Sequence, residues 1–206
     1  MAKKKKKNSP SRYKERVAEI KEIMQDERVR FGVGLVILFF VLFVVLATIS
    51  FFVTGGADQS IISMLTNERQ QHLSEIQNWT GFRGAIVSDW LINDLFGVAS
   101  LLLLVFPVVF SLRLMRVKVA KLWRAFLFPT LFAMWGGILL SFVFGSFFND
   151  SFMYVGGVNG LALSKILVLN IGMPGTLLIL LGSGIVIALF AFSSTLRHLK
   201  AVLFKK

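Results

Sequence analysis

The chain contains no cysteine, and only 11 of its 206 residues are aspartate or glutamate. The lack of cysteine excludes disulfides, thiolate metal sites and cysteine nucleophiles, and it says nothing about the cellular compartment. The chain also has no Gly-Lys pair for a phosphate-binding loop, no H-E-x-x-H and no G-x-S-x-G. We therefore expect no catalytic residue, no metal ion and no cofactor in this chain.

Charged residues are missing from four long runs, which lie at 31–57, 95–112, 125–149 and 166–196. A helix of roughly 20 apolar residues crosses the hydrocarbon core of a bilayer, so each run is long enough or nearly so. The hydrophobic content of 55% is too high for a soluble domain of this length. The sequence therefore predicts an all-α integral membrane protein with four transmembrane helices. The expected spans are about 31–53, 92–114, 125–148 and 172–196.

Basic residues concentrate in alternate segments of the chain. Of the 23 Lys and Arg residues, 20 lie in segments 1–30, 113–124 and 197–206. Cytoplasmic segments of membrane proteins carry such an excess, so we expect all three on the cytoplasmic side, with both termini inside. This topology puts His72 and His198 on opposite sides of the membrane, where they cannot share a metal ion.

Residues 1–30 are expected to form a basic cytoplasmic arm, and 197–206 a basic cytoplasmic tail. In the arm, Tyr13, Val17, Ile20 and Met24 recur at helical spacing and predict an amphipathic helix. Its charged flanks would hold it on anionic headgroups. Two other interpretations stay open, namely a solvated segment that only sets orientation and a lysine run that binds nucleic acid.

The two outer connections differ in character. Gly55 and Gly56 are expected to end the first span, and a long polar connection then runs to residue 84. The second connection, 149–171, ends in an apolar stretch that is too short to cross a bilayer. We expect this stretch to be re-entrant or interfacial, with Lys165 reaching the headgroups.

Small residues repeat every four positions within two spans, which lets helix backbones approach closely. The third span has Gly137, Ser141 and Gly145, and the fourth has Gly184 and Ala188. These five residues are the predicted helix-packing positions.

Two further stretches carry glycines at characteristic spacings. The first reads N-W-T-G-F-R-G-A-I-V-S-D-W-L over 78–91 and leads into D-L-F-G at 94–97. The second reads G-G-V-N-G over 156–160 and is followed by G-M-P-G at 172–175. Together they resemble the amino-terminal membrane domain of the FtsK/SpoIIIE family of DNA translocases, most closely its Bacteroidetes type. The motif residues are Asn78, Thr80, Gly81, Arg83, Gly84, Asp94, Gly97, Gly156, Gly157, Gly160, Gly172 and Gly175.

The resemblance implies a membrane anchor that acts in cell division and chromosome segregation. It implies a place in the bacterial inner membrane at the division septum, self-association into a homo-oligomer, and contacts with membrane proteins of the division machinery. DNA would be bound only by an ATP-driven motor domain, which is absent from these 206 residues. The pair Asn93-Asp94 departs from the family, which commonly has aromatic or apolar residues there. Arg83 is expected to pair with Asp89 or Asp94.

Two other function classes remain as alternatives. A small four-span transporter or channel subunit should have polar residues along a central pathway, and ionisable residues near the bilayer centre. A membrane-embedded enzyme should have acid and base residues at one depth. The ionisable residues Asp94, Asp150 and Lys165 instead fall at or near the ends of the expected spans, which favours the anchor.

Overall fold

The computed structural model describes residues 26–64, 66–148 and 151–192, and every regular element within them is a helix. Four helical segments in this part of the chain are long and apolar enough to cross a membrane. They are Glu27–Ile62, Gly81–Leu114, Leu122–Phe148 and Gly157–Ala191. The predicted all-α, four-helix membrane fold is therefore confirmed. The basic arm and the basic tail lie outside the described residues.

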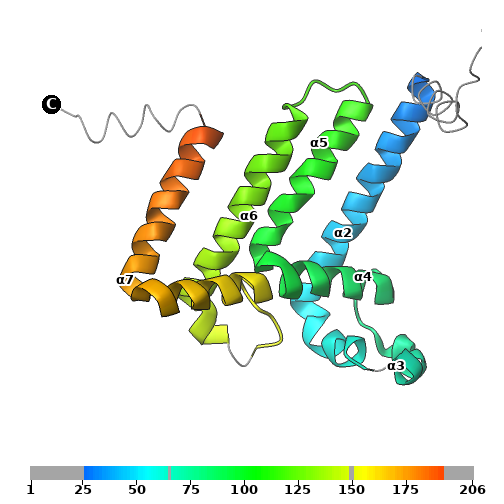
Figure 1. The fold of residues 1–206 in the computed structure, drawn as a ribbon. Coiled ribbons are helices and arrows are strands. Elements are labelled where there is room, and N and C mark those ends of the chain that lie inside the picture. Colours follow the sequence, from blue (N-terminus) through cyan, green and yellow to red (C-terminus); the bar gives the residue numbers. More distant parts are fainter. Residues whose placement is uncertain (1–25, 65, 149–150, 193–206) are drawn as a thin grey trace, which may run out of the picture.

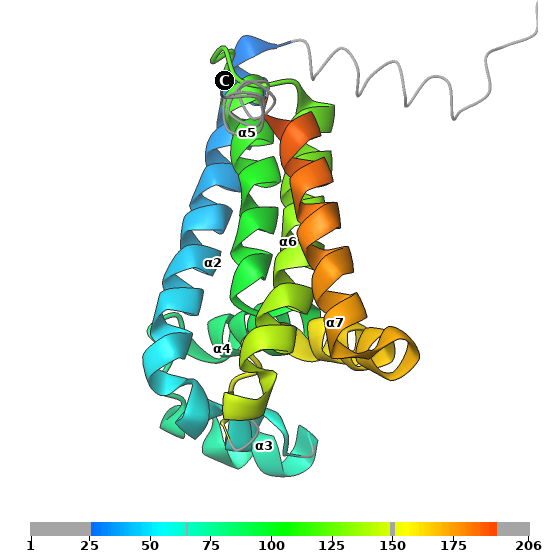
Figure 2. The same ribbon diagram turned by 90° about the vertical axis from the view of Figure 1, so that its left-hand side faces the viewer.

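The elements follow one another in a simple order (Figure 1). They are α2 (Glu27–Ile62), α3 (Thr66–His72), η1 (Leu73–Glu75), α4 (Gly81–Asp89), η2 (Trp90–Phe96), η3 (Gly97–Leu104), α5 (Val105–Leu114), α6 (Leu122–Phe144), η4 (Gly145–Phe148) and α7 (Gly157–Ala191). Four upright helical stretches run side by side: α2, η3 with α5, α6, and the second part of α7 (Figures 1 and 2).

Helix α2 is longer than the first predicted span, because it continues through Gly55 and Gly56 to Ile62. The prediction that these two glycines end the helix is wrong. Both face the ring of Phe152, and a Cβ on Gly55 would lie 2.8 Å from ring atoms of Phe51 and Phe152. The glycines therefore serve close packing inside a helix, where their missing side chains make room for aromatic rings.

Two helical segments lie across the foot of the upright helices (Figures 1 and 2). The first crossing segment is 81–96, formed by α4 and η2, and the second is 157–171, the first part of α7. Each turns upright at a glycine with positive φ, 66° at Gly97 and 71° at Gly172. Only glycine adopts such a backbone cheaply. The upright part of the second membrane segment thus begins at Gly97 rather than near residue 92. The second crossing segment contains the short apolar stretch that the sequence predicts to be re-entrant or interfacial, and it is helical and continuous with the rest of α7.

The two halves of the bundle share one plan, which we describe as a first repeat (27–114) and a second repeat (122–191). Each repeat descends as a long helix, crosses the foot and rises again (Figure 1). In both, the crossing segment starts at a glycine with φ near +70° whose N–H bonds the carbonyl three residues earlier. The residues Gly81, Gly84, Ser88 and Ser100 match Gly157, Gly160, Ser164 and Thr176 in one register, and Gly97 corresponds to Gly172 with a shift of one residue. Repeats that run in the same direction across a membrane are a known way to build such bundles.

The two ends of the bundle differ in charge. The basic end carries the start of α2, the end of α7 and the connection 113–124 with its five Lys and Arg residues. There the Ser111 hydroxyl donates to the Gly34 carbonyl at 2.6 Å, and Arg116 pairs with Glu27 at 2.9 Å. The opposite end, which we call the loop end, holds both crossing segments and α3.

Candidate functional site at the loop end

The turn before the first crossing segment is anchored on α2 by polar side chains. Asn78 is buried, and its amide donates to the Ala47 carbonyl at 3.1 Å. Its side-chain oxygen accepts from both the N–H and the hydroxyl of Thr80, at 3.1 and 2.7 Å. The N–H of Trp79 donates to the Ser50 hydroxyl at 2.9 Å. The motif residues Asn78 and Thr80 therefore order the turn within the chain.

Asp58 strengthens the same attachment, and sequence reasoning missed it. Its side chain is 1% exposed, and one carboxylate oxygen accepts from the Gln77 N–H at 2.7 Å. The other accepts from the Thr54 hydroxyl at 3.1 Å. A buried carboxylate needs such partners, because burial of an unpaired charge is costly. The available signal was an acidic residue directly after a long apolar run.

The residues at the start of the first crossing segment differ in how closely they are packed. Gly84 is packed inside the turn, since an added Cβ would meet the Thr80 hydroxyl. Gly81 has φ +70° and an added Cβ there would have no neighbour within 4 Å. Arg83 is exposed, and in the described part of the chain it forms no ion pair with Asp89 or Asp94, contrary to the sequence prediction.

Asn93 joins the two repeats at the centre of the loop end. Its amide donates to the Asp89 carboxylate at 2.7 Å and to the Phe152 carbonyl at 3.1 Å. Its oxygen accepts from the Tyr154 N–H at 2.9 Å. The side chain is 3% exposed. The neighbouring Asp94 has an exposed side chain, and its carbonyl accepts from the Asn159 amide at 2.8 Å. Asn93 was noted in the sequence only as a departure from a family pattern, although an amide among apolar residues signals a buried hydrogen-bond partner.

Three glycines let the two repeats touch through their backbones. An added Cβ on Gly97 would meet the carbonyl of Val155, and one on Gly157 would lie 2.6 Å from the Gly97 nitrogen. The added Cβ on Gly97 would also lie 2.6 Å from the Cα of Gly156, and Gly156 itself packs against Gly137 and Ser141 of its own repeat. The N–H of Val98 donates to the Val155 carbonyl at 3.0 Å. We call this contact the repeat joint.

Helix α6 contacts the repeat joint through part of its small-residue ladder, which is the row formed by Gly137, Ser141 and Gly145. An added Cβ on Gly160 would lie 2.5 Å from the Gly137 carbonyl oxygen, and Gly137 itself lies against the Phe96 backbone. Ser141 is buried beside Gly156. Gly145 is looser, since its nearest neighbour would be a Leu161 methyl at 3.6 Å.

The remaining predicted residues lie along α7. Gly184 packs under Trp135, whose indole N–H donates to the Leu180 carbonyl at 2.9 Å. The Ala188 carbonyl accepts from the Phe192 N–H at 3.0 Å. Gly172 and Gly175 would contact only residues of their own helix, Pro174 and Ile171. The structure therefore divides the motif residues among three places. Asp94, Gly97, Gly156, Gly157 and Gly160 lie at the repeat joint, residues 78–84 form the turn before the first crossing segment, and Gly172 and Gly175 lie outside both.

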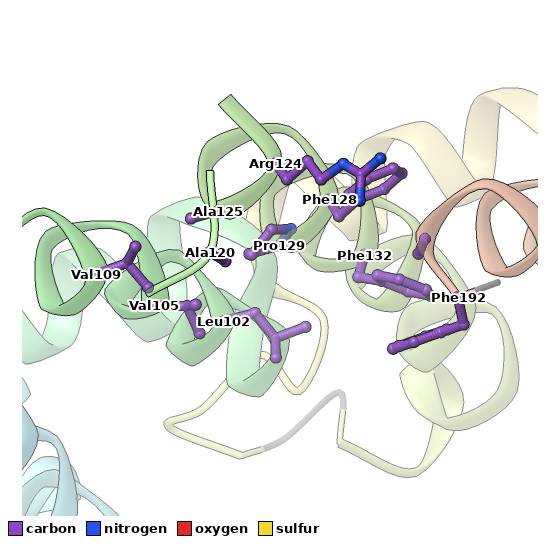
Figure 3. A pocket seen from close by; sticks show the side chains of 11 residues that line it. Leu102, Val105, Val109, Ala120, Arg124, Ala125, Phe128, Pro129, Phe132 and Phe192 are labelled. Carbon is purple, nitrogen blue, oxygen red and sulfur yellow. The ribbon is translucent and has the colours of Figure 1, made fainter. Parts of the chain in front are cut away.

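A groove of about 620 Å³ opens near the basic end between α5, α6 and the end of α7 (Figure 3). Phe132 and Phe192 lie side by side at one side of it, with ring centroids 6.1 Å apart. Arg124 lies at its rim, and Pro129 has no N–H to give to the Ala125 carbonyl. The mostly apolar wall suits hydrocarbon and carries no acid–base pair.

The comparisons with known proteins agree with this architecture. The family described as the 4TM region of DNA translocase FtsK/SpoIIIE matches residues 27–202. The chain belongs to this family. The predicted resemblance is thereby confirmed, and the matched FtsK/SpoIIIE region is a membrane domain rather than a catalytic motor. No curated protein and no solved structure matches the chain. In the described residues, no group of three or more His, Asp or Glu side chains could hold a metal ion.

Proposed function

We propose that this chain is the membrane anchor of an FtsK/SpoIIIE-type DNA translocase that acts in cell division and chromosome segregation. The observation that carries the proposal is the family match, because it extends over all four apolar helices. The buried polar residues at the loop end support an anchor as well. Asn78, Asp58 and Asn93 bond to groups of the chain itself, so their bonding capacity goes into holding the bundle together.

The basic end of the bundle faces the cytoplasm in this proposal. Segment 113–124 has five basic and no acidic residues, and positively charged connections stay on the cytoplasmic side. The start of α2 and the end of α7 lie at the same end (Figure 1). A motor domain joined to the start of α2 or to the end of α7 would therefore lie in the cytoplasm, where the chromosome is. The anchor itself would lie in the inner membrane of a bacterium.

Septal placement comes from contacts of the loop end with division-machinery membrane proteins. The segment of α3 and η1 projects beyond the crossing segments (Figures 1 and 2). Its exposed side chains include Glu68, Gln70, Gln71, Ser74 and Glu75. Arg69 ties the segment to the bundle, with a hydrogen bond to the Met64 carbonyl at 2.6 Å and its guanidinium 5.8 Å from the centre of the Phe82 ring. A polar surface held in this way is suited to specific partners. Self-association then concentrates the anchors at the septum.

A fluorescent fusion of the chain, observed in dividing cells of its own bacterium, tests this function. We expect a septal band in cells that constrict. The pair Glu68→Lys and Glu75→Lys should spread the signal over the whole envelope without lowering the amount in the membrane fraction. Asp94→Lys is the matched control, because Asp94 is an exposed carboxylate at the same end but outside α3 and η1. A uniform envelope signal from the unchanged chain at every stage of division would refute septal anchoring.

A further inference from the structure

Each crossing segment has a glycine turn at its start and another at its end, and the repeat joint uses only two of these four turns. The joint is made by the end of the first crossing segment, at Gly97, and the start of the second, at Gly157. The start of the first crossing segment, at Gly81, and the end of the second, at Gly172, also have positive φ, of 70° and 71°. Among the described residues, an added Cβ on Gly81 would have no neighbour within 4 Å, and one on Gly172 would meet only Pro174 of its own helix. The chain therefore has one occupied joint and two unoccupied halves of a second joint.

The unoccupied halves expose large apolar side chains where the joint buries its residues. Trp79, two residues before Gly81, is 65% exposed, and Met173, directly after Gly172, is 68% exposed. Their counterparts in the joint are Val155 and Val98, which are partly covered and joined by a backbone hydrogen bond at 3.0 Å. Leu169, close to Gly172, is 84% exposed. Large apolar side chains exposed in this way are removed from water or lipid when another surface packs against them.

We propose that copies of this chain associate head to tail, with the Gly81 turn of one copy packed against the Gly172 turn of the next, as Gly157 packs against Gly97 within each copy. This proposal rests on the proposed self-association and names the surface that produces it. The occupant is a second copy because the internal joint already shows which surface fits such a turn. The contact joins unlike surfaces, so it closes into a ring or grows as an open chain according to the rotation between copies.

Arg83 adds a polar contact to this surface. Its counterpart in the second repeat is Asn159, whose amide donates to the Asp94 carbonyl at the joint. Arg83 stands at the same position of the first crossing segment, with its side chain exposed. Its guanidinium has five donors, and it is placed to bond carbonyl groups at the end of the neighbouring copy's second crossing segment.

Cysteine cross-linking tests the arrangement directly, because the chain has no native cysteine. Two differently tagged chains, Trp79→Cys and Met173→Cys, are produced together in membranes and oxidised. Since the counterparts Val155 and Val98 share a backbone hydrogen bond, the two cysteines should approach within disulfide range. We expect a mixed dimer that carries both tags, no dimer from either chain alone, and a ladder of larger species from a chain with both substitutions. The control pair is Trp90→Cys with Met173→Cys. Trp90 is also an exposed tryptophan of the first crossing segment, but it lies away from the Gly81 turn that forms the proposed contact.

An independent count of subunits separates this proposal from the broader one. Step-wise photobleaching of fluorescent chains in native membrane patches gives the number of copies per particle. Particles of several copies without the mixed dimer would overturn the head-to-tail contact and leave self-association standing. Particles of one copy would overturn both. A dimer formed by one single-cysteine chain alone would indicate a two-fold contact and refute the proposal. Trp79→Ala should lower the copy number, whereas Trp90→Ala should leave it unchanged.

Discussion

The side-chain oxygen of Asn93 accepts a hydrogen bond from the backbone N–H of Tyr154 at 2.9 Å, although 61 residues separate the two in sequence. The amide of the same side chain donates to the Phe152 carbonyl at 3.1 Å. One buried asparagine therefore satisfies a donor and an acceptor of the turn that precedes the second crossing segment. This pairing fixes the second crossing segment against the end of the first.

Replacement of Asn93 by leucine should destabilise the bundle. The Tyr154 N–H and the Phe152 carbonyl would lose their partner, and a buried unpaired group costs roughly 1–3 kcal/mol. We expect a clearly lower melting temperature in detergent. The control is Asn170→Leu, because Asn170 is exposed and bonds only the Ile166 carbonyl of its own helix. Equal melting temperatures for the two variants would contradict the role given to Asn93.

Alanine at Gly97 should be more harmful than alanine at Gly81. Both positions have positive φ, which costs a residue with a Cβ roughly 1–3 kcal/mol. At Gly97 the Cβ would also run into the Val155 carbonyl, whereas the space around Gly81 is open within one copy. Thermal melting of detergent-solubilised monomers should rank Gly97→Ala well below Gly81→Ala. If the two variants melt together, backbone conformation alone explains both glycines.

Asp58 should control the order of the connection between α2 and the first crossing segment. Asp58→Leu removes the acceptor of the Gln77 N–H, whereas Asp58→Asn retains a side-chain oxygen for it. We expect trypsin to cut after Arg69 faster in the leucine variant and at the native rate in the asparagine variant. Equal cleavage rates in all three proteins would show that the hydrogen bond does not hold this connection.

The small-residue ladder of α6 should tolerate change at one end and resist it in the middle. Leucine at Ser141 would displace the turn at Gly156, so Ser141→Leu should lower the melting temperature without preventing insertion. Gly145→Ala should have little effect, because its nearest neighbour lies 3.6 Å from the new Cβ. Tolerance of leucine at Ser141 would mean that this face points to lipid.

The orientation of the bundle can be measured with single cysteines. Ser74→Cys at the loop end and Lys118→Cys at the basic end are both exposed positions. An impermeant thiol reagent applied to intact cells should label Ser74→Cys and leave Lys118→Cys unlabelled until the membrane is opened. The reverse pattern would place the basic end outside, against the distribution of positive charge.

The sequence by itself determined that this is a four-helix membrane protein of the FtsK/SpoIIIE 4TM family. The long uncharged runs decide the fold class because unpaired backbone groups cannot lie in hydrocarbon, so each run must be helical. The glycine motifs at 78–97 and 156–175 were sufficient to recognise the family that the match over 27–202 confirms. These features are local, and they depend on composition and spacing rather than on which segments meet.

Only the tertiary structure decided where the helices turn and which polar residues hold them. A glycine pair can end a helix or lie within one. Helix α2 continues through Gly55-Gly56 because Phe152, which is distant in sequence, packs against these glycines. The turns at Gly97 and Gly172 need positive φ, which a sequence pattern permits but does not require. Asn93 and Asp58 find their partners in segments that fold back on them. The physical reason is the same for the turns and for the buried polar residues. Hydrogen bonds and close contacts between segments distant in sequence select one backbone conformation from the several that glycine makes accessible.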